Sequence, residues 1–270
     1  MRNTGSAPKI RYALGMPTRG RTEALLQTLE AISQQTMSPE RIFLVDNNED
    51  GEVDLSTLDI PSSVVILPKA GSQILADQKC LEYATRLKYK YLVKWDDDLV
   101  PDKSCLERLV RGVSSNSVAA TGGMYYQEEQ TKRSWKDDQG LLCSGDGLAG
   151  HLQFSLWKGK HEALRVPALY SSFAYRVELA NVIGGFNKDL KIHRHDTEFT
   201  IRLSHIGALF VVTNAVAKHL VSSGGVRSGD KVERKEIMKK DCLVFENKMR
   251  DIGVDPFNWR DQCGQGANNG

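Results

Sequence analysis

Apolar and polar positions along the first half of the chain follow two alternating patterns. Short apolar runs, typical of buried strands, cover residues 10–16, 41–45, 64–67 and 91–95. Longer stretches at 22–34 and 74–87 repeat leucine, isoleucine or alanine at helical spacing. Strands that alternate with helices predict an α/β fold with a mostly parallel central sheet, flanking helices, and a ligand crevice at the carboxyl ends of the strands.

The second half is less regular. It predicts a strand at 118–124, a long polar and aromatic loop at 125–146, a hairpin with strands at 152–157 and 163–170, a helix at 173–183, a helix at 199–205, a strand at 209–213 and a helix within 229–253. A loop as long as 125–146 inside a compact domain is usually functional or mobile. Trp135 and Trp157 offer flat faces for a sugar or a base, or pack in the core.

Asp96, Asp97 and Asp98 follow one another at the end of the strand predicted at 91–95. Neighbouring carboxylates need a counter-charge, either from solvent or from a divalent cation that prefers hard oxygen ligands. A solvated turn is the common outcome for an acidic cluster. Here the triplet ends a buried strand and precedes Pro101 and a short helix predicted at 104–113, which favours a ligand site.

Other polar residues are expected at the same edge of the sheet. Pro17 and Thr18 end the first strand, Asp46 ends the second, and Gly71 follows the third. Asp46 is expected to accept a hydrogen bond from a base or ribose, or to cap a turn with its neighbouring asparagines. Taken alone, Thr18 and Arg21 are an N-cap and a surface charge of the first helix. Their convergence favours the functional interpretation.

Two further carboxylates, Asp196 and Glu198, begin the helix predicted near 199–205. Negative charge in a first helical turn interacts favourably with the helix dipole, so capping alone is one interpretation. A role in chemistry is the other.

Composition and charge do not favour a nucleic-acid-binding or membrane protein. The chain has 270 residues, is 26% charged and 40% hydrophobic, and has a net charge of +2, which gives no strong argument for a nucleic-acid or membrane partner. Its five cysteines lack C-x-x-C spacing, as expected of reduced thiols. No apolar run approaches the roughly 20 residues that span a bilayer. We therefore expect a cytoplasmic protein without a transmembrane segment, with a disordered tail at 264–270.

The motifs resemble those of the family 2 glycosyltransferases of the GT-A fold. The resemblance covers about residues 10–220 and is carried by Pro17-Thr18, Asp46, Asp96-Asp97-Asp98, Gly184-Gly185-Phe186, His195-Asp196-Thr197-Glu198 with Arg202-Leu203, and His219. It implies a Rossmann-like nucleotide-sugar-binding half at 10–122, an acceptor-binding and catalytic half at 123–220, and a C-terminal helical extension at 221–263.

The resemblance also implies residue roles. Those assigned to the nucleotide-sugar donor are Pro17, Thr18, Arg21, Asp46, Gly71, Gln78, Asp96 and Asp97. Those assigned to Mn²⁺ or Mg²⁺ are Asp96, Asp98 and His219. Asp196 matches the general base, and Glu198 either binds the acceptor or orients the helix. The reaction would be an inverting transfer from a nucleotide-sugar, with a UDP-sugar favoured, to a hydroxyl acceptor such as a glycan.

The chain departs from the family pattern at three places. Arg19-Gly20 stands where an aromatic residue and Asn are common, Asp77-Gln78 replaces a frequent Arg-Asn, and His195 replaces a frequent Glu. These changes leave the identity of the nucleotide and sugar open.

Lysines and arginines accompany the helix predicted within 229–253. They form either a solvated face or a surface for a polyanionic acceptor such as modified DNA. In the second case the protein would be a DNA-modifying glycosyltransferase that acts on a hydroxylated base. Gly224-Gly225 would let a flexible loop close over the donor. Two alternatives to transfer remain open: a nucleotide-sugar-binding protein without activity, and a metal-dependent phosphate-ester hydrolase.

Overall fold

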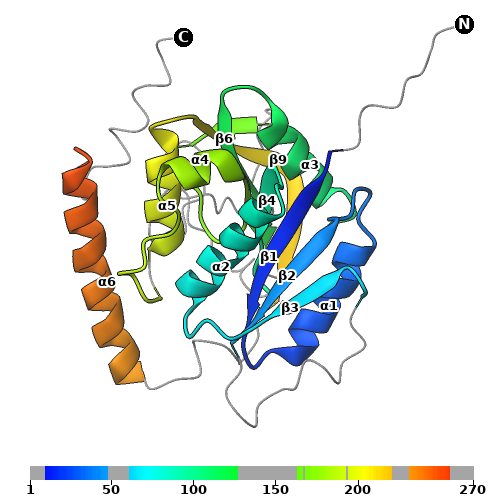
Figure 1. The fold of residues 1–270 in the computed structure, drawn as a ribbon, viewed down its shortest axis with the longest axis horizontal. Coiled ribbons are helices and arrows are strands. Elements are labelled where there is room, and N and C mark those ends of the chain that lie inside the picture. The colour runs from blue at the N-terminus through cyan, green and yellow to red at the C-terminus, as the bar shows by residue number, and fades with distance from the viewer. Residues whose placement is uncertain are drawn as a thin grey trace, which may run out of the picture.

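One mixed sheet joins the two halves of the chain (Figure 1). The computed structural model describes residues 10–47, 61–126, 163–166, 168–192, 194–220 and 231–255. Within these ranges the sheet has nine strands, in the order β3-β2-β1-β4-β8-β6-β9-β5, with β7 paired to β9.

The strands are β1 (Tyr12–Thr18), β2 (Arg41–Asp46), β3 (Val64–Leu67), β4 (Tyr91–Lys94), β5 (Leu99–Pro101), β6 (Val118–Tyr126), β7 (Ala163–Arg165), β8 (Phe173–Arg176) and β9 (Ala208–His219). The helices are α1 (Thr22–Ser33), α2 (Gln73–Arg86), α3 (Cys105–Ser114), α4 (Val177–Val182), α5 (His195–Ser204) and α6 (Lys231–Asp251). These elements confirm the α/β class.

Parallel pairing dominates the N-terminal half of the sheet. β1 pairs in parallel with both β2 and β4, and β2 pairs in parallel with β3. β8 then runs antiparallel between β4 and β6, while β6 and β9 are parallel. The carboxyl ends of these parallel strands therefore lie at the same edge of the sheet.

Each face of the sheet is covered by its own apolar cluster. Side chains of α1 and α3 pack on one face, and side chains of α2, α4 and α5 pack on the other. α6 lies beside α5 in Figure 1 and adds Phe245 and Met249 to the second cluster. None of the helices among the described residues has the length and apolar character needed to cross a membrane.

Backbone contacts bring the strand ends together. Thr18 is opposite Asp46 in the β1–β2 register, and the N–H of Trp95 donates to the carbonyl of Gly15 at 2.9 Å. The N–H of Leu220, just after β9, donates to the carbonyl of Asp98 at 2.8 Å. The Asp96–Asp98 segment therefore lies between the end of β1 and the end of β9.

The structure corrects two predicted elements. The helix predicted at 173–183 is a strand over Phe173–Arg176 and a helix only from Val177, because the first segment is buried between β4 and β6. The strand predicted at 209–213 continues to His219, since its second half pairs with β5 and β6.

Several other predictions fall wholly or mostly outside the described residues. Tyr125 and Tyr126 of the predicted loop belong to β6, and Ala163–Arg165 of the predicted hairpin pairs with β9. The predictions that lie outside the described residues are the rest of the loop to 146, Trp135, the hairpin strand 152–157 with Trp157, Gly224-Gly225 and the tail 264–270.

Candidate functional site

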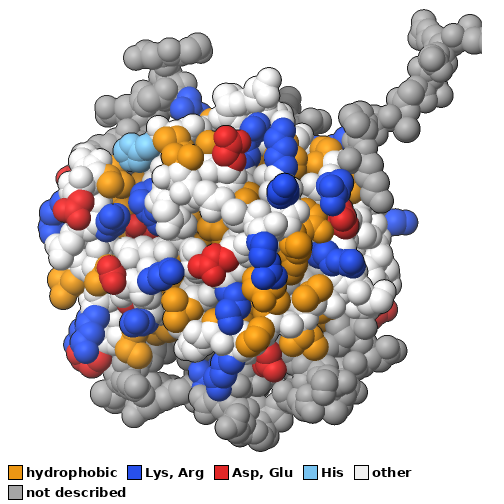
Figure 2. Space-filling model, in the orientation of Figure 1, with side chains coloured by type: hydrophobic (Ala, Val, Ile, Leu, Met, Phe, Trp, Pro, Cys, Tyr) orange, Lys and Arg blue, Asp and Glu red, His pale blue; other side chains and the backbone are white. Residues whose placement is uncertain are grey.

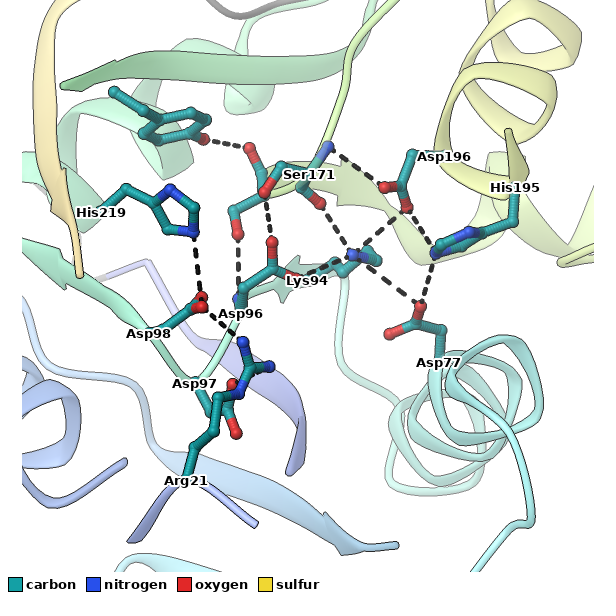
Figure 3. Close-up of polar contacts among 12 residues, drawn as sticks. Arg21, Asp77, Lys94, Asp96, Asp97, Asp98, Ser171, His195, Asp196 and His219 are labelled. Carbon is teal, nitrogen blue, oxygen red and sulfur yellow. Dashed lines mark hydrogen bonds and ion pairs between the residues drawn. The ribbon is translucent and has the colours of Figure 1, made fainter. Parts of the chain in front are cut away.

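The aspartate triplet turns its side chains in two directions (Figure 3). Asp97 and Asp98 face Arg21 at the start of α1. Asp96 faces Lys94, and its other carboxylate oxygen accepts a hydrogen bond from the hydroxyl of Ser171. The triplet thus divides between two groups of partners, one on the α1 side and one on the α5 side.

On the α1 side, two polar side chains hold Asp97. The hydroxyl of Thr18 donates to its carboxylate at 2.7 Å, and Arg21 pairs with it. Burial raises the pKa of Asp97 to about 7, although the Arg21 charge acts against the rise. Thr18 is therefore not the N-cap of α1, which begins at Thr22 without a side-chain cap, and Arg21 is not a solvated surface charge. Both residues contact the triplet.

Asp98 links Arg21 to the end of β9. Its Oδ2 accepts from Arg21 and lies 3.4 Å from Nε2 of His219. Asp98 is buried, while His219 remains partly exposed. A carboxylate and an imidazole that face each other across a strand end form a donor set that suits Mn²⁺ or Mg²⁺.

Asp96 does not join this pair. Among the described residues, Asp96, Asp98 and His219 do not form a group whose ligand atoms all lie within 4.8 Å of one another. The physical reason is the Lys94 ammonium, which lies 3.2 Å from Oδ1 of Asp96 and holds the pKa of this carboxyl below its usual value despite burial.

Lys94 is the centre of the α5 side. This lysine of β4 is 2% exposed, and its ammonium donates to the carbonyl of Ser171 at 2.8 Å. It also lies 3.2 Å from Oδ1 of Asp196 and 3.8 Å from Oδ2 of Asp77. Burial opposes the charge, but the surrounding carboxylates outweigh it and raise the pKa of Lys94 above its ordinary value.

Asp196 is held by two ion pairs and one hydrogen bond. Lys94 and Nε2 of His195, at 3.1 Å, face one of its oxygens, and the N–H of Ser171 donates to the other at 3.1 Å. Burial alone would raise the pKa of Asp196, but His195 and Lys94 lower it. In turn, burial would lower the pKa of His195, but Asp196 and Asp77 outweigh this and raise it to about 9.

Asp77, His195 and Asp196 also offer three ligand atoms within 4.8 Å of one another, a set that could hold a metal ion. The Lys94 ammonium already lies within 4 Å of both carboxylates of this group. Two cations in one buried position would repel each other strongly. The Lys94 side chain is 2% exposed, whereas that of Arg21, the cation beside Asp98, is 21% exposed. We therefore regard Lys94 as the cation of this group and the Asp98–His219 pair as the candidate metal position.

Glu198 and Gln78 lie away from the triplet. Both oxygens of Glu198 accept from Arg202, which also donates to the carbonyls of Ile183 and Gly185. Oε1 of Gln78 accepts from the N–H of Phe186 at 2.9 Å. The two side chains therefore support the glycine turn and α5; for Glu198 this geometry fits the helix-orienting alternative.

Pro17, Asp46 and Gly71 lie at the expected edge. Pro17 is opposite Val45 in the register of β1 and β2, and Asp46 ends β2. The turn that contains Gly71 is held by Asn47, whose Oδ1 accepts from the N–H of Ala70 at 2.9 Å and of Gly71 at 3.3 Å. Gly71 has a φ of +84°, a conformation that favours glycine.

The sequence prediction assigned no role to Lys94 or Ser171. For Lys94 a signal existed, because a lysine inside an otherwise apolar strand requires a buried counter-charge. Ser171 gave no signal, since its contact with Asp96 depends on how β8 enters the sheet.

Solved structures share the fold. They include the mannosyltransferase PcManGT from Pyrobaculum calidifontis in complex with GDP-Man and Mn²⁺, at 16% identity and a TM-score of 0.56, covering 80% of this chain and 59% of that one. GalNAc-T7 with UDP, GalNAc and Mn²⁺ matches at 15% identity and a TM-score of 0.60, covering 93% and 50%. S. aureus TarS matches at 14% identity and a TM-score of 0.54, covering 88% and 40%.

The chain thus spans 40% to 59% of the length of these three proteins, and the likeness assigns it to the GT-A fold. No curated protein matches it in sequence. A family model described as Glycosyl transferase family 2 matches residues 14–176, which run from β1 through the triplet to the end of β8. The chain therefore belongs to glycosyl transferase family 2.

Proposed function

We propose that this protein is a metal-dependent, inverting glycosyltransferase that moves a sugar from a nucleotide-sugar to a hydroxyl group of an acceptor. The observation that carries the proposal is the position of the Lys94 ammonium, 3.2 Å from both Asp96 and Asp196. One buried cation thus joins the carboxylate of the donor motif to the carboxylate proposed as base. Family membership supports the reaction class.

The donor is proposed to bind along the carboxyl ends of β1, β2 and β4. Asp46 would accept hydrogen bonds from the base, Asp96 would lie near the ribose, and the turn at Gly71 would border the nucleoside. A UDP-sugar is the preferred donor, following the resemblance; the related structures contain GDP-Man in one case and UDP in another.

Asp98 and His219 are proposed to hold Mn²⁺ or Mg²⁺. The pair fits such an ion because Oδ2 of Asp98 and Nε2 of His219 lie 3.4 Å apart, and oxygen and imidazole ligands together suit Mn²⁺ at least as well as Mg²⁺. Bound there, the ion would offset the negative charge that develops on the leaving diphosphate.

Asp196 is proposed to remove the proton from the acceptor hydroxyl. The hydroxyl oxygen attacks the anomeric carbon, the bond from that carbon to the diphosphate oxygen breaks with its electron pair on the diphosphate, and the proton moves to the Asp196 carboxylate. Its neighbours Lys94, His195 and Ser171 keep this carboxylate ionised and in one orientation. A single displacement of this kind inverts the configuration.

Calorimetry with UDP, GDP, dTDP and CDP, each with and without Mn²⁺, tests the donor site without knowledge of the acceptor. We expect one nucleotide to bind tightly only with Mn²⁺, and Asp98→Ala to abolish the Mn²⁺ dependence. Binding that ignores Mn²⁺ in both proteins would contradict the metal assignment. Donor binding without transfer to any acceptor would instead favour a non-catalytic binding protein.

The exposed side of α6 does not favour a polyanionic acceptor. Acidic residues are interspersed among its basic ones, and Lys239 pairs with Glu236 at 2.7 Å while Arg250 pairs with Glu246 at 3.6 Å. Figure 2 shows basic and acidic side chains intermixed over the face where α6 runs. A solvated helix face accounts for this pattern, and we propose a glycan or other hydroxyl acceptor.

A further inference from the structure

Arg21 carries the counter-charge of two buried carboxylates at once. Its guanidinium pairs with Asp97 through one nitrogen and with Asp98 through another, as Figure 3 shows. The Arg21 side chain is 21% exposed, whereas those of Asp97 and Asp98 are 0% and 6% exposed. Arg21 is therefore the member of this group that reaches solvent.

The same oxygen of Asp98 faces both Arg21 and His219. Oδ2 accepts from the guanidinium, and Nε2 of His219 lies 3.4 Å away from it. Because Oδ2 is the oxygen that faces His219, a divalent ion bound between Asp98 and His219 would lie next to the guanidinium. Like charges at such a distance in a partly buried site repel strongly. Arg21 and the metal therefore exclude each other at Asp98.

We infer that Arg21 is the resident counter-ion of Asp98, that a divalent metal displaces it, and that the diphosphate of the donor then receives the released guanidinium. This inference rests on the proposed function. It makes Arg21 a positioning residue that couples metal binding to donor binding, beyond a simple contact with the nucleotide.

The surroundings of Arg21 suit such an exchange. It is the residue that precedes helix α1, and Gly20 before it has a φ of +61°. Asp97 has a second partner besides Arg21, because the hydroxyl of Thr18 donates to it at 2.7 Å, so we assign the exchange of cations to Asp98. A guanidinium binds phosphate oxygens through two parallel hydrogen bonds, which makes a diphosphate a suitable new partner.

The inference predicts positive coupling between metal and nucleotide. In the wild-type protein Mn²⁺ alone has to displace Arg21 and binds weakly, whereas Mn²⁺ together with a nucleoside diphosphate gives Arg21 a new partner. We expect the nucleotide to raise the Mn²⁺ affinity at least about tenfold, within the usual range of coupling between sites. Reciprocity requires Mn²⁺ to raise the affinity for the nucleotide by the same factor.

The test measures Mn²⁺ binding by electron paramagnetic resonance, with Mn²⁺ alone and with UDP or GDP, for wild type and Arg21→Gln. We expect Arg21→Gln to bind Mn²⁺ alone about tenfold more tightly and to lose most of the coupling, as expected when the term that links two sites is removed. Arg21→Lys keeps the charge without the planar fork and should fall between them.

Two controls define the site. Arg11→Gln removes one cation from an exposed arginine–carboxylate pair with Glu40, at 2.7 Å, and should leave Mn²⁺ binding unchanged. The double variant Arg21→Gln/Asp98→Asn should lose the additional Mn²⁺ affinity, because the gained ion binds at Asp98. Far-ultraviolet circular dichroism of each variant checks that the fold is retained.

The inference would be overturned if Arg21→Gln bound Mn²⁺ alone no more tightly than wild type. It would also be overturned if the double variant, which lacks the Asp98 carboxylate, kept the additional Mn²⁺ affinity. The proposed function fails by a different result: wild type that binds Mn²⁺ with none of the nucleotides. In that case, a higher Mn²⁺ affinity of Arg21→Gln that depends on Asp98 would still support Arg21 as the resident counter-ion. An unchanged Mn²⁺ affinity would reject both the inference and the proposed function.

Discussion

Replacement of Lys94 by methionine tests the electrostatic balance at the centre of the site. Methionine keeps a long apolar side chain within β4 but removes the ammonium. Lys94 is 2% exposed and has three oxygens within 3.2 Å, from Ser171, Asp96 and Asp196. Lys94→Met therefore leaves buried carboxylates with one cation fewer.

The expected loss follows from this burial. Removing one partner of a buried ion pair costs about 3 to 5 kcal/mol, because the remaining charge stays desolvated. With a urea dependence of about 3 kcal/mol per M, the unfolding midpoint should fall by about 1 to 1.7 M. Urea unfolding followed by tryptophan fluorescence and circular dichroism at neutral pH measures this shift.

A second substitution separates charge balance from packing. Lys94→Met/Asp77→Asn removes one positive and one negative charge, and Asp77 is the most distant of the three carboxylates, at 3.8 Å. The double variant should recover a large part of the lost stability, since contacting residues are not additive. Lys188→Met serves as the matched control, because Lys188 forms an exposed pair with Glu82 at 4.0 Å and should have no measurable effect.

Two results would refute the reasoning. A Lys94→Met protein with the wild-type midpoint would mean that Lys94 is not the charged partner of these carboxylates. A double variant less stable than the single one would mean that Asp77 does not share the charge balance of Lys94.

Three further substitutions test other parts of the site. His195 has a pKa of about 9 in the folded protein against 6.5 ordinarily, so its stabilising proton is fully bound below pH 6.5 and lost as the pH rises to 9. Unfolding free energy should fall by up to about 3 kcal/mol across this range, and His195→Gln should lack that fall in urea titrations. Gly185→Ala should lower the unfolding free energy by about 1 to 3 kcal/mol, because Gly185 has a φ of +74° and an added Cβ would lie 2.3 Å from Oε1 of Gln78. Gly253→Ala is the matched control. Gly253 has the same φ, but an added Cβ would meet nothing within 4 Å, so the loss of unfolding free energy should be smaller. Asp196→Asn should keep nucleotide binding near normal while transfer falls by about 10² or more, and retained turnover would exclude the base role.

The fold followed from the sequence wherever its pattern has a clear period. Helices α1 and α2 each bury one stripe, so their buried side chains, such as Leu25, Leu29 and Ile32 of α1, repeat at helical spacing. β8 was missed for the opposite reason. It is buried between β4 and β6 with covered faces, so Phe173, Ala174 and Tyr175 are all buried and do not alternate with polar residues. Such a strand cannot be distinguished by periodicity from a buried helix.

The site divides in a similar way. Asp46, the triplet and His219 could be placed at one edge because parallel strands end together and the motifs have a fixed order. The need of Lys94 for a counter-charge could be read from the sequence, but its contacts with Ser171 and Asp196, and that of Ser171 with Asp96, could not, since they join residues more than 70 positions apart. Gln78 and Glu198 have side chains that could bind a donor or an acceptor. However, Gln78 accepts from the N–H of Phe186, next to the Gly184-Gly185 turn, and Glu198 accepts from Arg202.

Asp77 and His195, two of the chain's departures from the family pattern, contact each other. Oδ2 of Asp77 and Nε2 of His195 lie 3.6 Å apart, so the contact joins α2 to α5. The arrangement places an imidazole that favours its charged form beside Asp196. Because His195 lowers the pKa of Asp196, where a glutamate at the same position would raise it, His195 helps to keep the proposed base ionised.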